Sequence, residues 1–86
     1  MRFEVLVEVQ LLPGIADPQG ATIERALPAV GFTSVHGLRV GRAIRFEVDA
    51  DDEQAAAALA ESLAEKLLAN PVMEKAAISV SSTVLT

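Results

Sequence analysis

The chain has 86 residues, which suits one domain spanning residues 1–86 and is too short for two. Hydrophobic residues make up 51% of it, yet only Phe3, Phe32 and Phe46 are aromatic, so aliphatic side chains must supply most of the core. The absence of cysteine excludes disulfides, thiol nucleophiles and cysteine metal sites. A net charge of −5, with dispersed basic residues, disfavours binding to nucleic acid.

Two further patterns bear on where the protein acts. No apolar run approaches the ~18 residues that a membrane-spanning helix needs, so no membrane insertion is expected. Met1 leads directly into an alternating pattern, with no secretory signal ahead of it. The sequence therefore predicts a cytoplasmic protein.

The first predicted element is a β-strand from Arg2 to Leu11, because apolar and polar residues alternate there. Pro13-Gly14 ends it. The face expected to be buried carries Phe3, Val5, Val7, Val9 and Leu11.

A helix is predicted to follow, with Asp17 as its N-cap and Pro18 at its first position. Gly31 supplies a left-handed stop, and Pro28 predicts that the last turn is kinked or lost. The apolar positions recur at helical spacing at Ile23, Leu27 and Val30.

The middle of the chain predicts two short strands, one around His36 to Val40 and one around Ile44 to Val48. Gly41-Arg42 between them suggests a tight hairpin. A second helix begins in the acidic stretch of residues 49–53 and runs to about residue 69, where Asn70-Pro71 ends it. Its predicted apolar face carries Ala56, Leu59, Ala60, Leu63, Ala64 and Leu67.

A last strand contains Ile78 and Val80, which completes the order β-α-β-β-α-β. This order is typical of the ferredoxin-like plan. The predicted fold class is therefore α+β, a two-layer sandwich in which two helices cover one face of a four-stranded antiparallel sheet. The other face of the sheet is expected to be mostly polar.

Few residues here could carry catalysis. His36 is the only histidine, and its alternation with apolar residues favours a structural role over that of a catalytic base. The carboxylates fall on solvent-facing positions and helix starts, which is typical of solvating groups rather than of an acid/base pair. No spacing of ligands predicts a metal site. We expect no catalytic residue, no metal and no cofactor.

Three segments are more specific than a plain domain requires. Gly20 at the third helical position costs up to about 1 kcal/mol relative to alanine, which hints at close approach by another backbone or another chain. Arg39 and Arg42 flank Gly41 and could present a basic loop to carboxylates of a partner. The three segments are Asp17-Pro18-Gln19-Gly20, Gly37-Leu38-Arg39-Val40-Gly41-Arg42 and the stretch from Glu65 through Asn70-Pro71-Val72-Met73 to Glu74.

In this order and spacing, the three segments resemble the PurS family. That family shows Asp-Pro-Gln-Gly after the first strand, then Val-Arg-x-Gly-Lys, then a helix ending Lys-Leu-Leu-Ala-Asn-Pro-Val-Ile-Glu. The chain matches from Arg2 to about Val80. It departs at Arg42, where the family usually has lysine, at Ala43, where a large residue is common, and at Lys75-Ala76.

The resemblance implies a subunit with no reaction of its own. PurS-like proteins join a PurL synthetase chain to a PurQ glutaminase chain, and the complex converts formylglycinamide ribonucleotide, glutamine and ATP to the amidine. A homodimer or tetramer is implied as well. The partner-binding residues that the resemblance suggests are Asp17, Pro18, Gln19, Gly20, Arg39, Gly41, Arg42, Asn70, Pro71, Val72 and Met73.

Three alternatives share the predicted fold. An ACT-type sensor would bind an amino acid at a dimer interface. A small enzyme would have to use His36 as its proton carrier. An RNA-binding version is least favoured, because the middle strands lack stacking aromatic residues.

Overall fold

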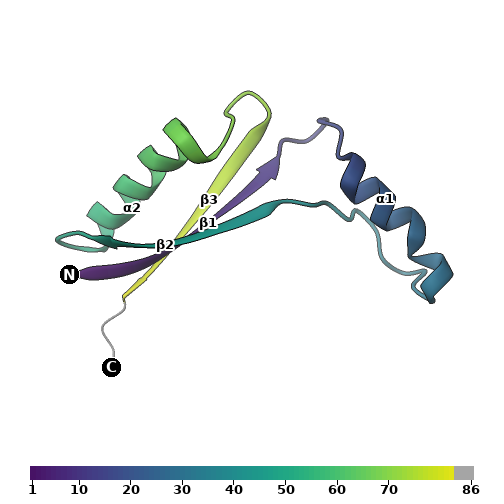
Figure 1. The fold of residues 1–86 in the computed structure, drawn as a ribbon, viewed down its shortest axis with the longest axis horizontal. Coiled ribbons are helices and arrows are strands. Elements are labelled where there is room, and N and C mark those ends of the chain that lie inside the picture. Colours follow the sequence, from purple (N-terminus) through teal and green to yellow (C-terminus); the bar gives the residue numbers. More distant parts are fainter. Residues whose placement is uncertain (83–86) are drawn as a thin grey trace.

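The computed structural model describes residues 1–82, and residues 83–86 lie outside this range. Figure 1 shows a twisted sheet with one helix packed on it and a second helix beyond its end. In chain order the elements are β1 (Arg2–Leu11), α1 (Pro18–Ala26), the 3₁₀ turn η1 (Pro28–Val30), β2 (Arg42–Asp49), α2 (Glu53–Leu63), the π-helical turn η2 (Ala64–Leu68) and β3 (Glu74–Ser82).

The first strand forms the centre of the sheet, as its alternating pattern predicted. It pairs antiparallel with β2 on one side and with β3 on the other, in the order β2-β1-β3. Val7 faces Ile44 across one pair and Ile78 across the other, so the apolar positions of all three strands share one face. The buried side chains on β1 are Phe3, Val5, Val7 and Val9.

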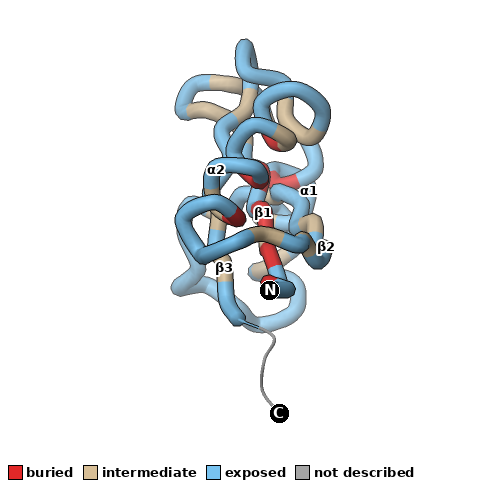
Figure 2. The backbone as a smooth tube through the Cα atoms, turned by 90° about the vertical axis from the view of Figure 1, so that its left-hand side faces the viewer, coloured by how far each residue is buried: buried red, intermediate tan, exposed pale blue. Residues whose placement is uncertain are grey.

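Helix α2 covers this apolar face with alanines. Ala56 and Ala60 of α2 and Ala64 of η2 are 0%, 0% and 3% exposed, which lets the helix lie close to the sheet. The broad apolar face predicted for this helix is only partly buried, since Leu59 and Leu67 remain exposed. Figure 2 shows the buried residues concentrated on β1 and on the inner side of α2.

Both helix starts and the predicted break in the first helix are confirmed. Asp17 and Asp52 cap α1 and α2 by accepting hydrogen bonds from backbone N–H groups. Helix α1 ends at Ala26, before Pro28, and the chain turns through η1 to Gly31, which has φ +95°. No helix in the described residues is long and apolar enough to cross a membrane.

The predicted four-stranded sheet is wrong, because the described residues form three strands. Residues 36–40 are not a strand, and Gly41-Arg42 does not turn a hairpin; the chain instead runs from α1 into β2. The backbone N–H groups of Leu38 and Val40, which a strand would use in its ladder, donate instead to Glu24 of α1 and to its N-cap Asp17. The predicted pair of helices on one face is wrong too, since only α2 packs on the sheet (Figure 1).

The alanine packing under α2 gives a stability prediction. Ala60→Leu inserts a side chain where none fits, so we expect it to lower the free energy of unfolding by about 1–3 kcal/mol. Ala58→Leu is the control, because Ala58 is an exposed residue of the same helix. Urea unfolding followed by circular dichroism measures both. Equal stability of the two variants would contradict the close packing of α2.

Candidate functional site

The three segments predicted from the sequence meet where β1 ends and β2 begins. A groove of about 330 Å³ opens there, between the start of α1 and the start of β2. We call it the motif groove. Its lining residues are Val9, Leu11, Asp17, Pro18, Gln19, Val40, Gly41, Arg42 and Glu74.

The carboxylate of Asp17 joins the first segment to the second. Its Oδ1 accepts the N–H of Gly20 at 3.0 Å, and its Oδ2 accepts the N–H of Val40 at 2.8 Å. Arg39 adds its Nε at 3.8 Å from the same Oδ2. The Asp17 side chain is only 8% exposed, so these bonds replace nearly all of its contact with water. We call this set of contacts the Asp17 bridge.

Gly20 is closely packed inside the Asp17 bridge. A Cβ atom at this position would overlap the Asp17 carboxylate and would lie 3.1 Å from the carbonyl oxygen of Leu38. One turn along α1, Glu24 Oε1 accepts the N–H of Leu38 at 2.9 Å. Asp17, Gly20 and Glu24 therefore form one face of α1, which is packed against residues 38–40.

Arg42 joins the second segment to the third. Its guanidinium donates to Glu74 Oε2 at 2.7 Å, to Glu74 Oε1 at 3.1 Å and to the carbonyl oxygen of Leu68 at 2.7 Å. Glu74 also accepts the N–H of Asn70 at 2.8 Å and is 13% exposed. The guanidinium thus closes the turn that follows α2, and we call this set of contacts the Arg42 bridge.

Gly41 lies between the two bridges, at a point where β1 passes so close that a side chain has no room. A Cβ atom at Gly41 would lie 2.6 Å from the carbonyl oxygen of Val9. Beyond the Arg42 bridge, Asn70 Oδ1 accepts the N–H of Val72, which shapes the turn around Pro71. Val72 and Met73 are 79% and 42% exposed, so they do not form part of the core.

The bridges perturb the ionisation of their acids. Hydrogen bonds from the N–H groups of Val40 and Gly20, aided by Arg39, lower the pKa of Asp17. Hydrogen bonding to Arg42 and to the Asn70 N–H lowers the pKa of Glu74, and Glu74 in turn raises the pKa of Arg42. At neutral pH both carboxylates are ionised, so neither is a proton donor.

The motif groove contains five of the eleven predicted site residues, namely Asp17, Pro18, Gln19, Gly41 and Arg42. Gly20 and Arg39 support it from outside, and the segment from Asn70 to Met73 joins it only through Glu74. Sequence reasoning missed the roles of Glu24 and Glu74. Glu24 lies seven residues after Asp17, which places both acids on one helix face, and that spacing could have indicated the contact.

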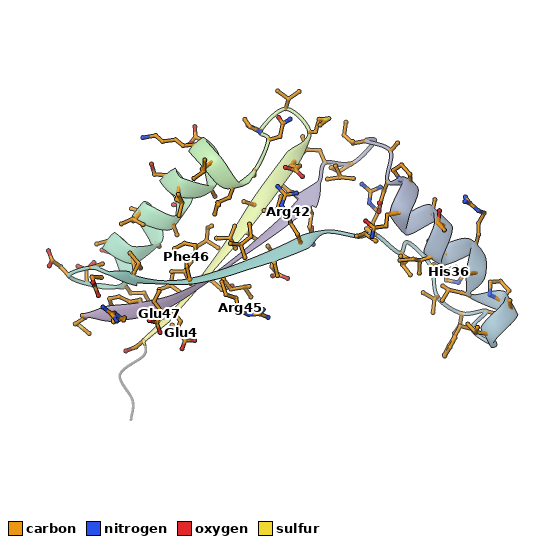
Figure 3. All side chains as sticks on the ribbon, viewed as in Figure 1. Glu4, His36, Arg42, Arg45, Phe46 and Glu47 are labelled. Atoms are coloured by element: carbon orange, nitrogen blue, oxygen red, sulfur yellow. The ribbon has the colours of Figure 1, made fainter. Side chains whose placement is uncertain are left out.

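Nothing in this arrangement resembles a reaction centre. His36 is exposed and lies beside α1, well separated in space from Arg42 in Figure 3. Within residues 1–82 no group of three His, Asp or Glu side chains could hold a metal ion. A second hollow, of about 590 Å³, lies on the sheet face away from α2, where Figure 3 shows Glu4, Arg45 and Glu47 projecting.

Comparison with known proteins decides the family. Residues 4–82 match the model of the family described as "PurS: Phosphoribosylformylglycinamidine (FGAM) synthase". The chain belongs to the PurS family. It is 37% identical over 73 residues to the PurS subunit of phosphoribosylformylglycinamidine synthase from Thermotoga maritima, covering 85% of this chain and 89% of the relative. It is 44% identical to the corresponding subunit from Mycobacterium leprae, over 80% of this chain and 84% of that one.

Solved structures agree with this membership. The crystal structure of the PurS subunit from Thermotoga maritima superposes with a TM-score of 0.86 at 33% identity, over 94% of this chain and 93% of that one. A structure of PurLQS from the same organism contains a chain that matches with the same TM-score and identity, over 94% and 99%. The α+β fold and the family membership predicted from the sequence are therefore confirmed.

The Asp17 bridge predicts an unusual response to Gly20→Ala. In an ordinary helix this change stabilises by up to about 1 kcal/mol. Here we expect it to destabilise, because the new methyl group displaces the Asp17 carboxylate. In an Asp17→Ala background the same change should cost less. Urea unfolding of the two single variants and the double variant measures the coupling. Fully additive effects would show that Gly20 is not required by Asp17.

The lowered pKa values predict an acid-sensitive fold. Asp17, Asp49 and Glu74 each have a pKa below the ordinary 3.8 or 4.5, through hydrogen bonds to N–H groups or arginines. Their contribution is complete above the unfolded pKa and is lost as the pH falls through the folded pKa. The free energy of unfolding should therefore fall between about pH 5 and pH 3.

The variants that test this are Asp17→Asn and Glu74→Gln, each of which should flatten the pH dependence measured by urea unfolding. Asp51→Asn is the control, because Asp51 is exposed between β2 and α2. If Asp51→Asn flattened the curve as much as Asp17→Asn, the acid sensitivity could not be assigned to the bridges.

Proposed function

We propose that this chain is the small, non-catalytic subunit of phosphoribosylformylglycinamidine synthase in de novo purine biosynthesis. In this role it joins a PurL synthetase chain to a PurQ glutaminase chain. The observation that carries the proposal is the match of residues 4–82 to the PurS model. The matching chain in the PurLQS structure from Thermotoga maritima supports it.

The reaction explains why such a subunit needs no catalytic group. Glutamine is hydrolysed in one chain of the complex, and the ammonia must reach the other chain, where ATP and formylglycinamide ribonucleotide react. A chain that holds the two enzymes together, and could assist ammonia transfer, needs surfaces rather than a nucleophile.

The partner-binding surface that we propose includes the motif groove and the turn beside it. The bridges use Asp17 and Arg42 within the chain, so these two residues shape the surface. Exposed neighbours such as Gln19, Val72 and Met73 are better placed to touch another protein. Val72 stands out because its exposed fraction, 79%, is the highest among the exposed large apolar residues of the described chain.

The remaining parts of the proposal concern context. We propose that the protein acts in the cytoplasm as a homodimer or tetramer, and that it binds neither nucleic acid nor a membrane. It needs no cofactor of its own, because the ATP belongs to the synthetase chain.

The ACT-type amino-acid sensor is not favoured. The family model and the relatives described above are PurS chains, and the sequence identities extend over most of the chain. The sensor predicts saturable binding of an amino acid by the isolated protein. The subunit predicts no such binding.

Reconstitution tests the proposed function. We expect the matching PurL and PurQ chains to show glutamine-dependent ATP turnover only when this protein is added, and we expect no turnover from this protein alone. Equal turnover by the two large chains without it would refute the subunit role. Isothermal titration with amino acids would then be the test of the sensor.

Val72 provides a sharper test of the surface. Val72→Asp places a charge on an exposed position, so we expect the isolated chain to keep its stability while glutamine-dependent turnover falls at least tenfold at limiting subunit. Ala58→Asp places the same charge on the exposed side of α2 and should leave turnover unchanged. If both variants supported full turnover, the turn after α2 would not be a partner contact.

A further inference from the structure

The proposed function requires two separate surfaces, because one chain that joins two others must touch both. The motif groove and the turn after α2 supply one surface. The hollow of about 590 Å³ on the sheet face away from α2 shares no lining residue with the motif groove. We call this face the polar sheet face, and the side chains that stand on it in the hollow are Glu4, Leu6, Arg45, Glu47, Ser79 and Ser81.

Long charged side chains stand on this face over β1 and β2. Glu4 lies directly opposite Glu47, and Leu6 lies directly opposite Arg45. The three charged residues are exposed, whereas Leu6 is half-buried. Figure 3 shows the charged side chains projecting away from α2. An apolar centre with charged groups beside it is the usual anatomy of a protein–protein interface.

Small side chains make the same face low over β3. Ser79 lies opposite Leu6, and Ser81 lies opposite Glu4. Ala77 continues this row of small residues along the strand. The step down from the charged side chains to the serines forms the hollow. A segment of another protein can therefore lie along β3 and reach both Leu6 and the carboxylates.

The pairing of Glu4 with Glu47 costs the isolated chain stability, because like charges directly opposite each other on neighbouring strands repel. Arg2 relieves this only in part. Its guanidinium lies 3.8 Å from Glu47 but makes a shorter contact, of 2.9 Å, with Asp49. Within residues 1–82 Glu4 forms no ion pair. A lysine or arginine brought between the two carboxylates would remove the repulsion.

The charge of the polar sheet face favours a basic partner over a second copy. The residues around Leu6 include the carboxylates of Glu4, Glu8 and Glu47 but only one guanidinium, that of Arg45. The whole chain carries a net charge of −5. A second copy would bring the same excess of carboxylates against this face, and like charges across an interface oppose binding. A basic segment complements it.

We propose that the polar sheet face is the second docking surface of this subunit and binds a basic segment of one of its two partner chains. A lysine or arginine of that segment lies between Glu4 and Glu47, and an apolar side chain beside it covers Leu6. The inference rests on the proposed function, and it adds a surface that none of the three sequence segments contains. The motif groove and the turn after α2 are then left for the other partner chain.

Neutralising the two carboxylates tests this surface. The variant is Glu4→Gln/Glu47→Gln. The matched control is Asp51→Asn/Glu61→Gln, which removes the same charge from two exposed acids outside the polar sheet face. A tagged copy of each protein is mixed with the matching PurL and PurQ chains, glutamine and ATP, and the captured chains are quantified.

We expect the Glu4/Glu47 double variant to capture at least tenfold less of one partner chain while it still captures the other. The control should capture both as the unmodified protein does. In urea unfolding the isolated double variant should be at least as stable as the unmodified chain, because the change removes a repulsion. Loss of stability would assign the two carboxylates to the fold and overturn the proposal.

The other outcomes also decide. Undiminished capture of both chains, loss of both, or an equal loss by the control overturns the docking surface. A change in the mass of the isolated double variant in sedimentation equilibrium overturns it too, because a second copy would then be the occupant. Glutamine-dependent turnover with the unmodified protein is measured alongside. If turnover depends on the unmodified protein, the docking surface can fail while the subunit role stands.

Discussion

The carboxylate of Asp17 is the group on which the position of α1 depends. It accepts one N–H from α1 and one from Val40, and in doing so it replaces the strand pairing that residues 36–40 would otherwise offer. An almost buried carboxylate that lost these donors would retain the cost of desolvation without compensation. Gly20, Leu38 and Glu24 are arranged around it. The bridge ends at Val40, and this fixes where β2 can begin.

The Arg42 bridge applies the same principle at the other end of the groove. A bidentate guanidinium–carboxylate contact with Glu74 also reaches the carbonyl oxygen of Leu68, one of the last acceptors of the second helix. Arginine can make all these contacts at once because its donors are spread over a planar fork, whereas lysine offers a single point. The arginine at this position, where the family usually has lysine, therefore suits the closed turn of this chain.

Most of the fold could be predicted from the sequence, because local patterns determine most of it. The alternation in β1, the cap at Asp17, the stop at Gly31 and the break before Pro28 are each set by residues close in the chain. The fourth strand could not be excluded in this way. Its absence depends on Asp17 and Glu24, which lie 23 and 14 residues from the N–H groups that they accept.

The candidate site shows the same division. The sequence identified the three segments, because glycine within a helix and arginines beside a glycine are unusual without a reason. It interpreted Arg39 and Arg42 as groups presented to a partner, whereas the structure pairs both with acids of the same chain. That pairing joins residues far apart in the sequence, so periodicity could not have indicated it. Leu59 and Leu67 were likewise placed on the apolar face of the second helix. The sequence could not show that this part of the face has no element packed over it within the described chain.

The central claim is that the Asp17 carboxylate holds α1 against residues 38–40. Amide hydrogen exchange measured residue by residue, in the native chain and in Asp17→Asn, tests this claim most directly. The account predicts that the N–H groups of Val40 and Gly20 are protected in the native chain and lose protection together in the variant, while β1 keeps its own. Exchange of the Val40 N–H at the rate of an unfolded peptide in the native chain would contradict it.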